Sequence, residues 1–282
     1  MFHVEHNKRI SIKDYLVSGE HFDVAWISRH TAQTLPQPTA EEMPVYYASE
    51  AYISHQKTKR SLIDILYHLS RFWMMRRKEA WISPYLNPHA RILDFGCGTG
   101  AFVEHLDQRK YQAQGIEPSR AARENAAKHL SIYGSIEEIK GDFQLISLWH
   151  VLEHLPDPLE TLSQLDQKLT SNGHLLIALP NFNSWDAKHY GPLWAAWDVP
   201  RHLWHFSPEG VVSLLSALDY QLVQKKAMPL DAFYISYLSE KHKKSSFPFF
   251  KGIIKGMYSN LMGIKTSHYS SQLYVFKRKG KP

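Results

Sequence analysis

Short apolar runs alternate with stretches of helical periodicity from about residue 90 onward. The first run holds Ile92 and Leu93, and residues 101–106 then carry apolar side chains at helical spacing. Further runs predict strands over 111–116, 129–133, 143–149, 174–179, 220–228 and 272–276. Helices are predicted over 121–128, over 158–169 and from Ser207 onward. Asn172-Gly173 is expected to end the second of these helices. This alternation is typical of a doubly wound α/β domain with a mostly parallel sheet.

The first 84 residues follow another pattern and predict an extension to a domain that covers residues 85–282. Residues 4–18 allow a short hairpin, and prolines break a connector over 34–38. Apolar side chains recur at helical spacing over 59–82, which predicts a long amphipathic helix. This helix either packs against an edge of the sheet or forms a lid, whose Tyr52, Ser54 or His55 would reach a ligand.

A glycine-rich turn follows the first predicted strand, in the run RILDFGCGTG over residues 91–100. Asp94 ends the apolar run, and Gly96, Gly98 and Gly100 follow at alternate positions. Because glycine has no Cβ, this backbone can turn tightly and approach a ligand closely, and the helix behind it offers free N–H groups. Dinucleotide enzymes use GxGxxG in this place, whereas the spacing here is GxGxG. We interpret Cys97 as a small buried side chain and not as a nucleophile.

An acidic residue, Glu117, ends the second predicted strand and precedes Pro118, about 20 residues beyond the glycine turn. A carboxylate has two oxygens, so it can accept hydrogen bonds from both hydroxyls of a ribose. The alternative is an acid that the dipole of the next helix favours. Given the glycine turn, we prefer the ribose interpretation.

The glycine turn, Glu117 and the segment HVLEHLPDP (residues 150–158) together resemble the class I S-adenosylmethionine-dependent methyltransferases. The likeness is greatest to the type that includes the ubiquinone-pathway O-methyltransferases, and it is strongest over residues 90–230. It implies a Rossmann-like, seven-stranded sheet with an antiparallel last strand, an insertion over 229–266, and S-adenosyl-L-methionine as the cofactor. By the same resemblance, the cofactor-binding residues are Asp94, Gly96, Cys97, Gly98, Gly100, Glu117, Pro118, Ser135, Ile136, Trp149 and His150.

Residues 182–206 form an unusually long connection, dense in tryptophan and histidine. This stretch resembles the corresponding region of one large methyltransferase family, where we expect it to form the substrate-side wall. It follows the carboxyl end of a central strand, where ligands of open α/β sheets bind. Its aromatic side chains equally fit a plain core or a stacking surface for a base.

Methyl transfer is an in-line displacement, so such an enzyme mainly aligns a nucleophile and excludes water. A hydroxyl or amine acceptor must also lose a proton, and a base helps this step. Our candidates for the base are His150 and His202, because histidine titrates near neutral pH, and Asp198, as a base or as the group that orients a histidine. Residues in such places are more often structural, as His154 also illustrates. No metal site is predicted.

Charge is unevenly distributed along the 282 residues, which carry a net charge of +6. Residues 241–282 contain ten Lys or Arg and no Asp or Glu, and the rest of the chain has a net charge of −4. A basic segment can attract nucleic acid or anionic lipid, or can simply be a solvated face. Its apolar residues share one helical face: Phe250, Ile253, Ile254, Met257 and Leu261. We expect this helix to pack onto the domain, with a membrane-surface helix as the alternative.

One cysteine excludes a disulfide within the chain and favours a reducing compartment, which we take to be the cytoplasm. The polar first residues contain no secretory signal, and no apolar run approaches a membrane span. We therefore predict an enzyme that methylates an O or N nucleophile of a small, apolar or aromatic acceptor. The alternative is a non-catalytic module of the same fold that binds RNA or anionic membrane through residues 241–282. A nicotinamide-dependent dehydrogenase is a third reading, and the GxGxG spacing counts against it.

Overall fold

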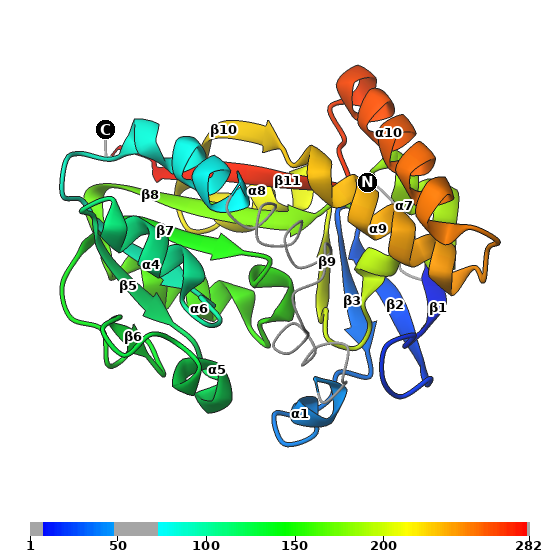
Figure 1. Ribbon diagram of the computed structural model, residues 1–282, viewed down its shortest axis with the longest axis horizontal. Coiled ribbons are helices and arrows are strands. Elements are labelled where there is room, and N and C mark those ends of the chain that lie inside the picture. The colour runs from blue at the N-terminus through cyan, green and yellow to red at the C-terminus, as the bar shows by residue number, and fades with distance from the viewer. Residues whose placement is uncertain (1–7, 48–72, 281–282) are drawn as a thin grey trace, which may run out of the picture.

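The computed structural model describes residues 8–47 and 73–280, which form two β-sheets (Figure 1). The larger sheet has the order β10-β11-β8-β7-β4-β5-β6. Its strands are β4 (Arg91–Phe95), β5 (Gln112–Ile116), β6 (Ile132–Tyr133), β7 (Phe143–Trp149), β8 (Leu169–Pro180), β10 (Tyr220–Ala227) and β11 (Ser271–Arg278). Strand β11 is antiparallel to both of its neighbours, and the other pairs run parallel. This arrangement confirms the predicted doubly wound, mostly parallel seven-stranded sheet.

Helices alternate with the strands of this sheet: α4 (Ala101–Gln108) follows β4, α5 (Arg120–Glu124) follows β5, α6 (Pro158–Asp166) follows β7, and α8 (Pro208–Ser216) precedes β10. Strands β4 and β7 are buried almost throughout, as expected for parallel strands with both faces covered. The side chains of Ser119, Asp157 and Ser207 each accept a hydrogen bond from the backbone N–H three residues later. These caps fix where α5, α6 and α8 begin.

A second sheet joins the start of the chain to the long connection after β8. It has the order β1-β2-β3-β9, with β1 (Arg9–Lys13), β2 (His21–Ser28), β3 (Thr31–Leu35) and β9 (Trp204–Phe206), all antiparallel. The prediction of a hairpin within residues 4–18 was wrong, because β1 pairs with β2, which begins only at His21. The connector over 34–38 was also misplaced, since Thr34 lies buried within β3. This sheet spans the boundary expected at residue 84.

The connection over residues 182–206 is more ordered than a loop. It contains α7 (Trp185–Tyr190), the short 3-10 helices η4 (Gly191–Leu193) and η5 (Ala195–Trp197), and then β9. The predicted helix over 158–169 also differs, since α6 ends at Asp166. Asn172-Gly173 lies inside β8, at an irregularity where Leu169 pairs with Phe143 and His174 with Leu145. Strand pairing on both sides of this irregularity overrides the local turn signal.

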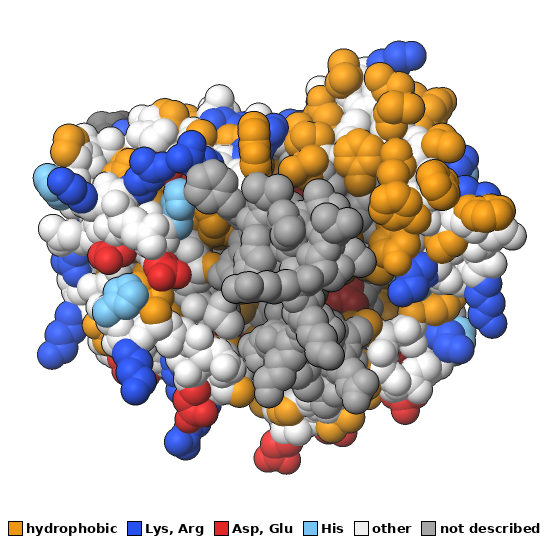
Figure 2. Space-filling view, in the orientation of Figure 1, with side chains coloured by type: hydrophobic (Ala, Val, Ile, Leu, Met, Phe, Trp, Pro, Cys, Tyr) orange, Lys and Arg blue, Asp and Glu red, His pale blue; other side chains and the backbone are white. Residues whose placement is uncertain are grey.

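The insertion forms two helices, α9 (Pro229–His242) and α10 (Pro248–Thr266), which stand at the right of Figure 1. Helix α10 packs on α9 through glycines: a Cβ on Gly252 would lie 2.6 Å from Tyr237 Cα, and one on Gly256 would lie 2.7 Å from Phe233 Cα. Its apolar face therefore does not pack onto the domain as we had expected. That face is exposed, and Figure 2 shows hydrophobic side chains gathered there.

Residues 73–82 form a helix that leads through η2 (Ser83–Tyr85) to the first strand of the larger sheet. A short helix, α1 (Met43–Tyr46), ends the N-terminal part. The lid residues suggested above, Tyr52, Ser54 and His55, lie outside the described residues. Within residues 8–47 and 73–280, no helix combines the length and the apolar character that crossing a membrane requires.

Candidate active site

The glycine turn adopts the backbone that its sequence requires. Gly96, Gly98 and Gly100 have φ values of 74°, 56° and 75°, in the left-handed region. A Cβ on Gly96 would lie 2.4 Å from Val151 Cγ2, and one on Gly100 would lie 2.4 Å from Ile132 Cδ1. A Cβ on Gly98 would meet no atom of the described residues within 4 Å. The outer glycines thus serve packing, and the middle one borders open space where a ligand can approach the backbone.

Glu117 is held at the end of β5 by two backbone donors. Its Oε2 accepts from the N–H of Gly98 at 3.0 Å, and its Oε1 accepts from the N–H of Ser119 at 2.8 Å. Arg123 Nη1 donates to the carbonyl oxygens of Glu117 and Pro118, which fixes the backbone of this turn. Each carboxylate oxygen retains a second lone pair. The carboxylate is therefore oriented beside Gly98 and can accept two more hydrogen bonds.

Two polar groups of the turn point into the protein. Asp94 is buried and accepts a hydrogen bond from Ser147 Oγ at 2.7 Å. Burial raises the pKa of Asp94 to about 6, although the charge of Lys78 and the bond from Ser147 oppose the rise. Cys97 packs its Sγ against Gly115, and burial raises the pKa of this thiol well above its usual value. A thiol that stays protonated suits the predicted packing role and not a nucleophile.

The other residues expected at the cofactor lie along the same carboxyl edge of the sheet. Trp149 ends β7 with its ring stacked on Trp81 at 6.0 Å between centroids, and its Nε1 has no hydrogen-bond partner among the described residues. Ile136 is buried in the main core, and Ser135 beside it is half-buried. Of this pair, Ser135 is the better placed to meet a ligand.

His150 lies between two carboxylates. Its Nε2 is 3.2 Å from Asp231 Oδ2 at the start of α9, and its Nδ1 is 3.3 Å from Glu153 Oε1. Burial alone would lower the pKa of His150, but the two carboxylates raise it to about 10. An imidazolium at neutral pH cannot accept a proton, so this geometry does not favour His150 as the base. The sequence gave no sign of Asp231 as its partner.

Asp198 also has a structural partner. Its Oδ1 accepts from Nε and Nη2 of Arg201 at 3.0 and 2.8 Å, and Asp14 accepts from the same Nη2 at 2.9 Å. Burial opposes ionisation of Asp198, but neighbouring His202 and Arg201 lower its pKa below the usual value. Because Asp198 Oδ2 lies 4.0 Å from His202 Nε2, it fits a positioning group better than a base.

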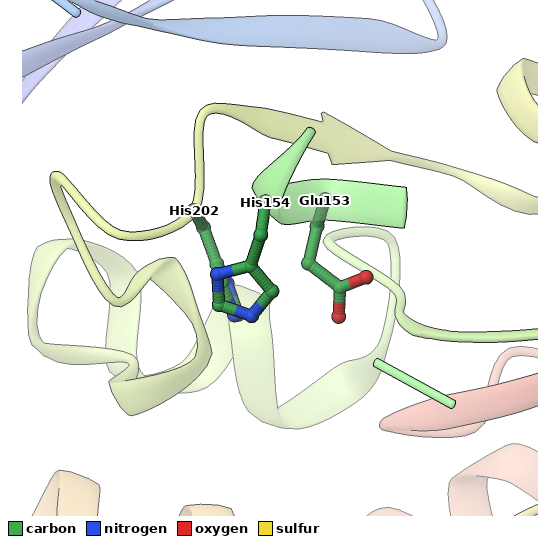
Figure 3. A group of neighbouring side chains, drawn as sticks. All are labelled: Glu153, His154 and His202. Carbon is green, nitrogen blue, oxygen red and sulfur yellow. The ribbon is translucent and has the colours of Figure 1, made fainter. Parts of the chain in front are cut away.

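Glu153, His154 and His202 come together beside this network (Figure 3). The first two belong to η3 (Leu152–His154), which follows β7, and the third precedes β9. The backbone N–H of Leu203 donates to the carbonyl of Glu153 at 2.8 Å and ties the two segments together. The rings of His154 and His202 are 4.6 Å apart. Sequence analysis named Glu153 only as part of a motif and missed this grouping.

Most aromatic side chains of residues 182–206 belong to the core and not to a wall. Trp194 and Trp197 are buried, and Trp194 Nε1 donates to Asp186 Oδ2 at 2.8 Å. With Phe182 they join a cluster that includes residues of the second sheet. The plain-core alternative therefore holds for these three residues. The substrate-side role of this segment stays a prediction.

The open space at Gly98 and the oriented carboxylate of Glu117 fit a nucleoside cofactor. A protein family described as "Methyltransferase domain" matches residues 65–225, more than half of the chain. The chain belongs to this methyltransferase family. Both the predicted family and S-adenosylmethionine, the cofactor of the class I enzymes, are thereby confirmed. The role of each site residue remains a prediction.

Individual relatives of this methyltransferase match a shorter segment. The mitochondrial ubiquinone biosynthesis O-methyltransferase of Schizosaccharomyces pombe is 31% identical over 101 residues, which cover 31% of this chain and 37% of that protein. The trans-aconitate 2-methyltransferase of Deinococcus radiodurans is 34% identical over 100 residues, which cover 33% of this chain and 39% of that protein. The chain thus spans well under half the length of these relatives.

Solved structures share the fold. A magnesium protoporphyrin IX methyltransferase from Synechocystis PCC 6803, with bound S-adenosylhomocysteine, aligns with a TM-score of 0.54 at 12% identity. The alignment covers 83% of this chain and 97% of that one. A SAM-dependent methyltransferase from Archaeoglobus fulgidus aligns with a TM-score of 0.50 at 18% identity. That alignment covers 74% of this chain and 94% of the other. At such identities the likeness shows the class I fold and nothing about the acceptor.

Proposed function

We propose that this protein transfers a methyl group from S-adenosylmethionine to an oxygen or nitrogen of a small acceptor. The observation that carries the proposal is the carboxylate of Glu117, held by two backbone N–H groups beside the open backbone of Gly98. When bound, the cofactor supplies a methyl group on a sulfonium, which is a good leaving group. The protein then has to bind both reactants in line and exclude water.

The names of the relatives favour oxygen as the accepting atom, because one is an O-methyltransferase and another is named for trans-aconitate. We assign the acceptor side to the group of Glu153, His154 and His202, which lies on the segment directly after β7. His202 keeps its place as a catalytic candidate. Asp198 and His150 act as positioning residues, since both are engaged in ion pairs. The single cysteine supports a reducing compartment such as the cytoplasm.

Titration calorimetry with S-adenosylmethionine and S-adenosylhomocysteine tests the cofactor site, with NAD as the competing ligand. We expect binding of both sulfur compounds and none of NAD. A labelled methyl group then reports transfer to a panel of phenols, carboxylic acids and amines. A folded protein that binds neither sulfur compound would refute the enzyme. Cofactor binding without transfer to any acceptor would favour the non-catalytic alternative.

We also propose that the exposed face of α10 lies on an anionic membrane surface. Phe250, Ile254 and Met257 expose 65%, 58% and 53% of their area on this face. Lys251 is exposed one residue after Phe250, Lys255 lies one turn further on with its Nζ 5.8 Å from the centre of the Trp185 ring, and α10 contains no acidic residue. An apolar face with lysines close by matches acyl chains below anionic headgroups. Nucleic acid fits less well, because apolar side chains and not lysines occupy the centre of the face (Figure 2).

Co-sedimentation with vesicles tests this surface, using neutral phosphatidylcholine and a mixture with phosphatidylserine. Each lysine near such a surface contributes about 1 kcal/mol, so the double variant Lys251→Glu, Lys255→Glu should lose binding roughly 30-fold or more. Phe250→Ser with Ile254→Ser should weaken binding to both vesicle types. Ile27→Ser, at a residue that is 48% exposed on β2, is the matched control. Binding to RNA but not to vesicles, or dimerisation through α10, would overturn the membrane proposal.

A further inference from the structure

The group of Glu153, His154 and His202 has the composition of a divalent metal site. One candidate ligand atom from each residue lies within 4.8 Å of the other two. Two imidazoles and one carboxylate are a common ligand set for zinc and related transition metals. Bound ions sit about 2.0–2.2 Å from such atoms, so small side-chain rotations would close these ligands around an ion.

Both histidines already have the tautomer that a metal requires. His154 Nδ1 lies 3.0 Å from the carbonyl oxygen of Arg201 and 3.0 Å from the hydroxyl of Tyr47, which can accept as well as donate. His202 Nδ1 lies 2.9 Å from the carbonyl oxygen of Ala196. A carbonyl only accepts, so each Nδ1 carries the proton and each Nε2 presents a lone pair. Metal-binding histidines are typically oriented by such a bond from the opposite ring nitrogen. These bonds hold the rings in place without using the atoms that would bind an ion.

Glu153 supplies a buried carboxylate that its neighbours satisfy only in part. Its side chain is 2% exposed, and neither oxygen has a hydrogen-bond partner among the described residues. His150 Nδ1 approaches Oε1 at 3.3 Å as an ion-pair contact. His150 faces only Oε1, so Oε2 stays without a partner among the described residues, and a buried carboxylate oxygen of this kind is costly unless a donor or a cation completes its surroundings.

The space beside this group suits an ion and not an organic molecule. Glu153 and His202 line a small pocket together with Trp194, Trp204 and His205. It offers room for about one water molecule. The 4.0 Å between His202 Nε2 and Asp198 Oδ2 also places a second carboxylate close by. An ion with one water or one acceptor oxygen as its remaining ligand would fill this space.

We propose that Glu153, His154 and His202 bind a divalent transition-metal ion of the zinc type. The site follows β7, the strand next to β4 and its glycine turn, so the ion faces the acceptor side. Its role rests on the proposed function: a metal lowers the pKa of a bound hydroxyl. The acceptor proton then passes to solvent, and the oxygen bonds to the methyl carbon as the carbon–sulfur pair leaves on sulfur. Metal binding itself does not depend on that reaction.

Zinc titration of the untagged, chelator-treated full chain tests the site in the absence of cofactor. We expect one ion per chain, and with cobalt an absorption spectrum typical of nitrogen and oxygen ligands in low coordination. Glu153→Gln and His202→Gln should each weaken zinc binding by at least roughly 10–100-fold, the range that loss of a group behind a ligand already causes. His21→Gln, at an exposed histidine on β2, is the matched control and should leave binding unchanged.

Unfolding curves of each variant accompany the titrations, and His154→Gln replaces a variant that does not fold. No bound ion in the folded wild-type protein would overturn the inference, as would zinc binding that Glu153→Gln and His202→Gln leave intact. Zinc binding that these variants abolish would support the site even if no acceptor is methylated. Cofactor binding and methyl transfer that persist without any bound metal would overturn the role of the metal in the reaction and leave the proposed function standing.

Discussion

The carboxylate of Glu117 offers the sharpest test of the cofactor site. Its two oxygens already hold the backbone N–H groups of Gly98 and Ser119 at 3.0 and 2.8 Å. Glu117→Ala removes this acceptor pair without touching the core, because the side chain is only half-buried. The glycine turn keeps its shape from the packing of Gly96 against Val151 and from its own backbone bonds. The variant should therefore fold but bind the cofactor more weakly than the wild type.

The expected loss follows from the hydrogen bonds that a ribose diol can donate. A hydrogen bond to a charged group contributes about 1.5–3 kcal/mol, and a diol donates at most two. In the variant, water accepts some of the hydrogen bonds that the diol donates. We therefore expect the binding free energy to weaken by about 2–3 kcal/mol, which raises Kd roughly 30–150-fold. Glu117→Gln should lose nearly as much, because an amide has one acceptor oxygen for two backbone donors.

Titration calorimetry with S-adenosylhomocysteine measures this loss, and urea unfolding shows that each variant is folded. Glu124→Ala is the matched control, since Glu124 is an exposed acid on α5 that pairs only with Arg120 at 2.7 Å among the described residues. Its affinity for the cofactor should equal that of the wild type. An unchanged Kd for Glu117→Ala, or an equal loss in both variants, would refute the ribose interpretation.

Three further predictions concern stability and the glycine turn. Gly100→Ala should cost about 1–3 kcal/mol in urea unfolding, because φ is 75° and the new Cβ would lie 2.4 Å from Ile132 Cδ1. Gly98→Ala meets no neighbour within 4 Å in the part of the chain that the structure describes, so it should retain more stability than Gly100→Ala yet bind the cofactor at least ~10-fold more weakly in calorimetry. Burial would raise the pKa of Asp14, but the bond from Arg201 and two backbone N–H groups lower it to about 2 from 3.8. Asp14→Asn should therefore cost about 2 kcal/mol near neutral pH, and the difference from the wild type should shrink as pH falls from about 4 towards 2. A difference that stays constant over that range would contradict the ion-pair origin.

The chain's local pattern already contained the larger sheet and the cofactor turn. Apolar runs separated by helical periodicity predict alternating strands and helices, and the right-handed crossover rule leaves few ways to arrange them. Gly96, Gly98 and Gly100 predict a tight turn that can approach a ligand, because glycine adopts backbone conformations that other residues avoid. Glu117 was predicted to face the cofactor because it ends the second predicted strand. Each of these features depends on neighbours in sequence, so no tertiary structure was needed to find them.

Tertiary structure decided the rest, because the contacts involved join segments that are distant in sequence. Sequence could not show that β9 pairs with β3, or that glycines turn the apolar face of α10 outward. It proposed His150 as a base, but a pKa depends on charges nearby in space, and Asp231 and Glu153 make this histidine an imidazolium. It also treated Glu153 and His202 separately. Only the fold, by tying the segment after β7 to the one before β9, brings them to one point where they can act together.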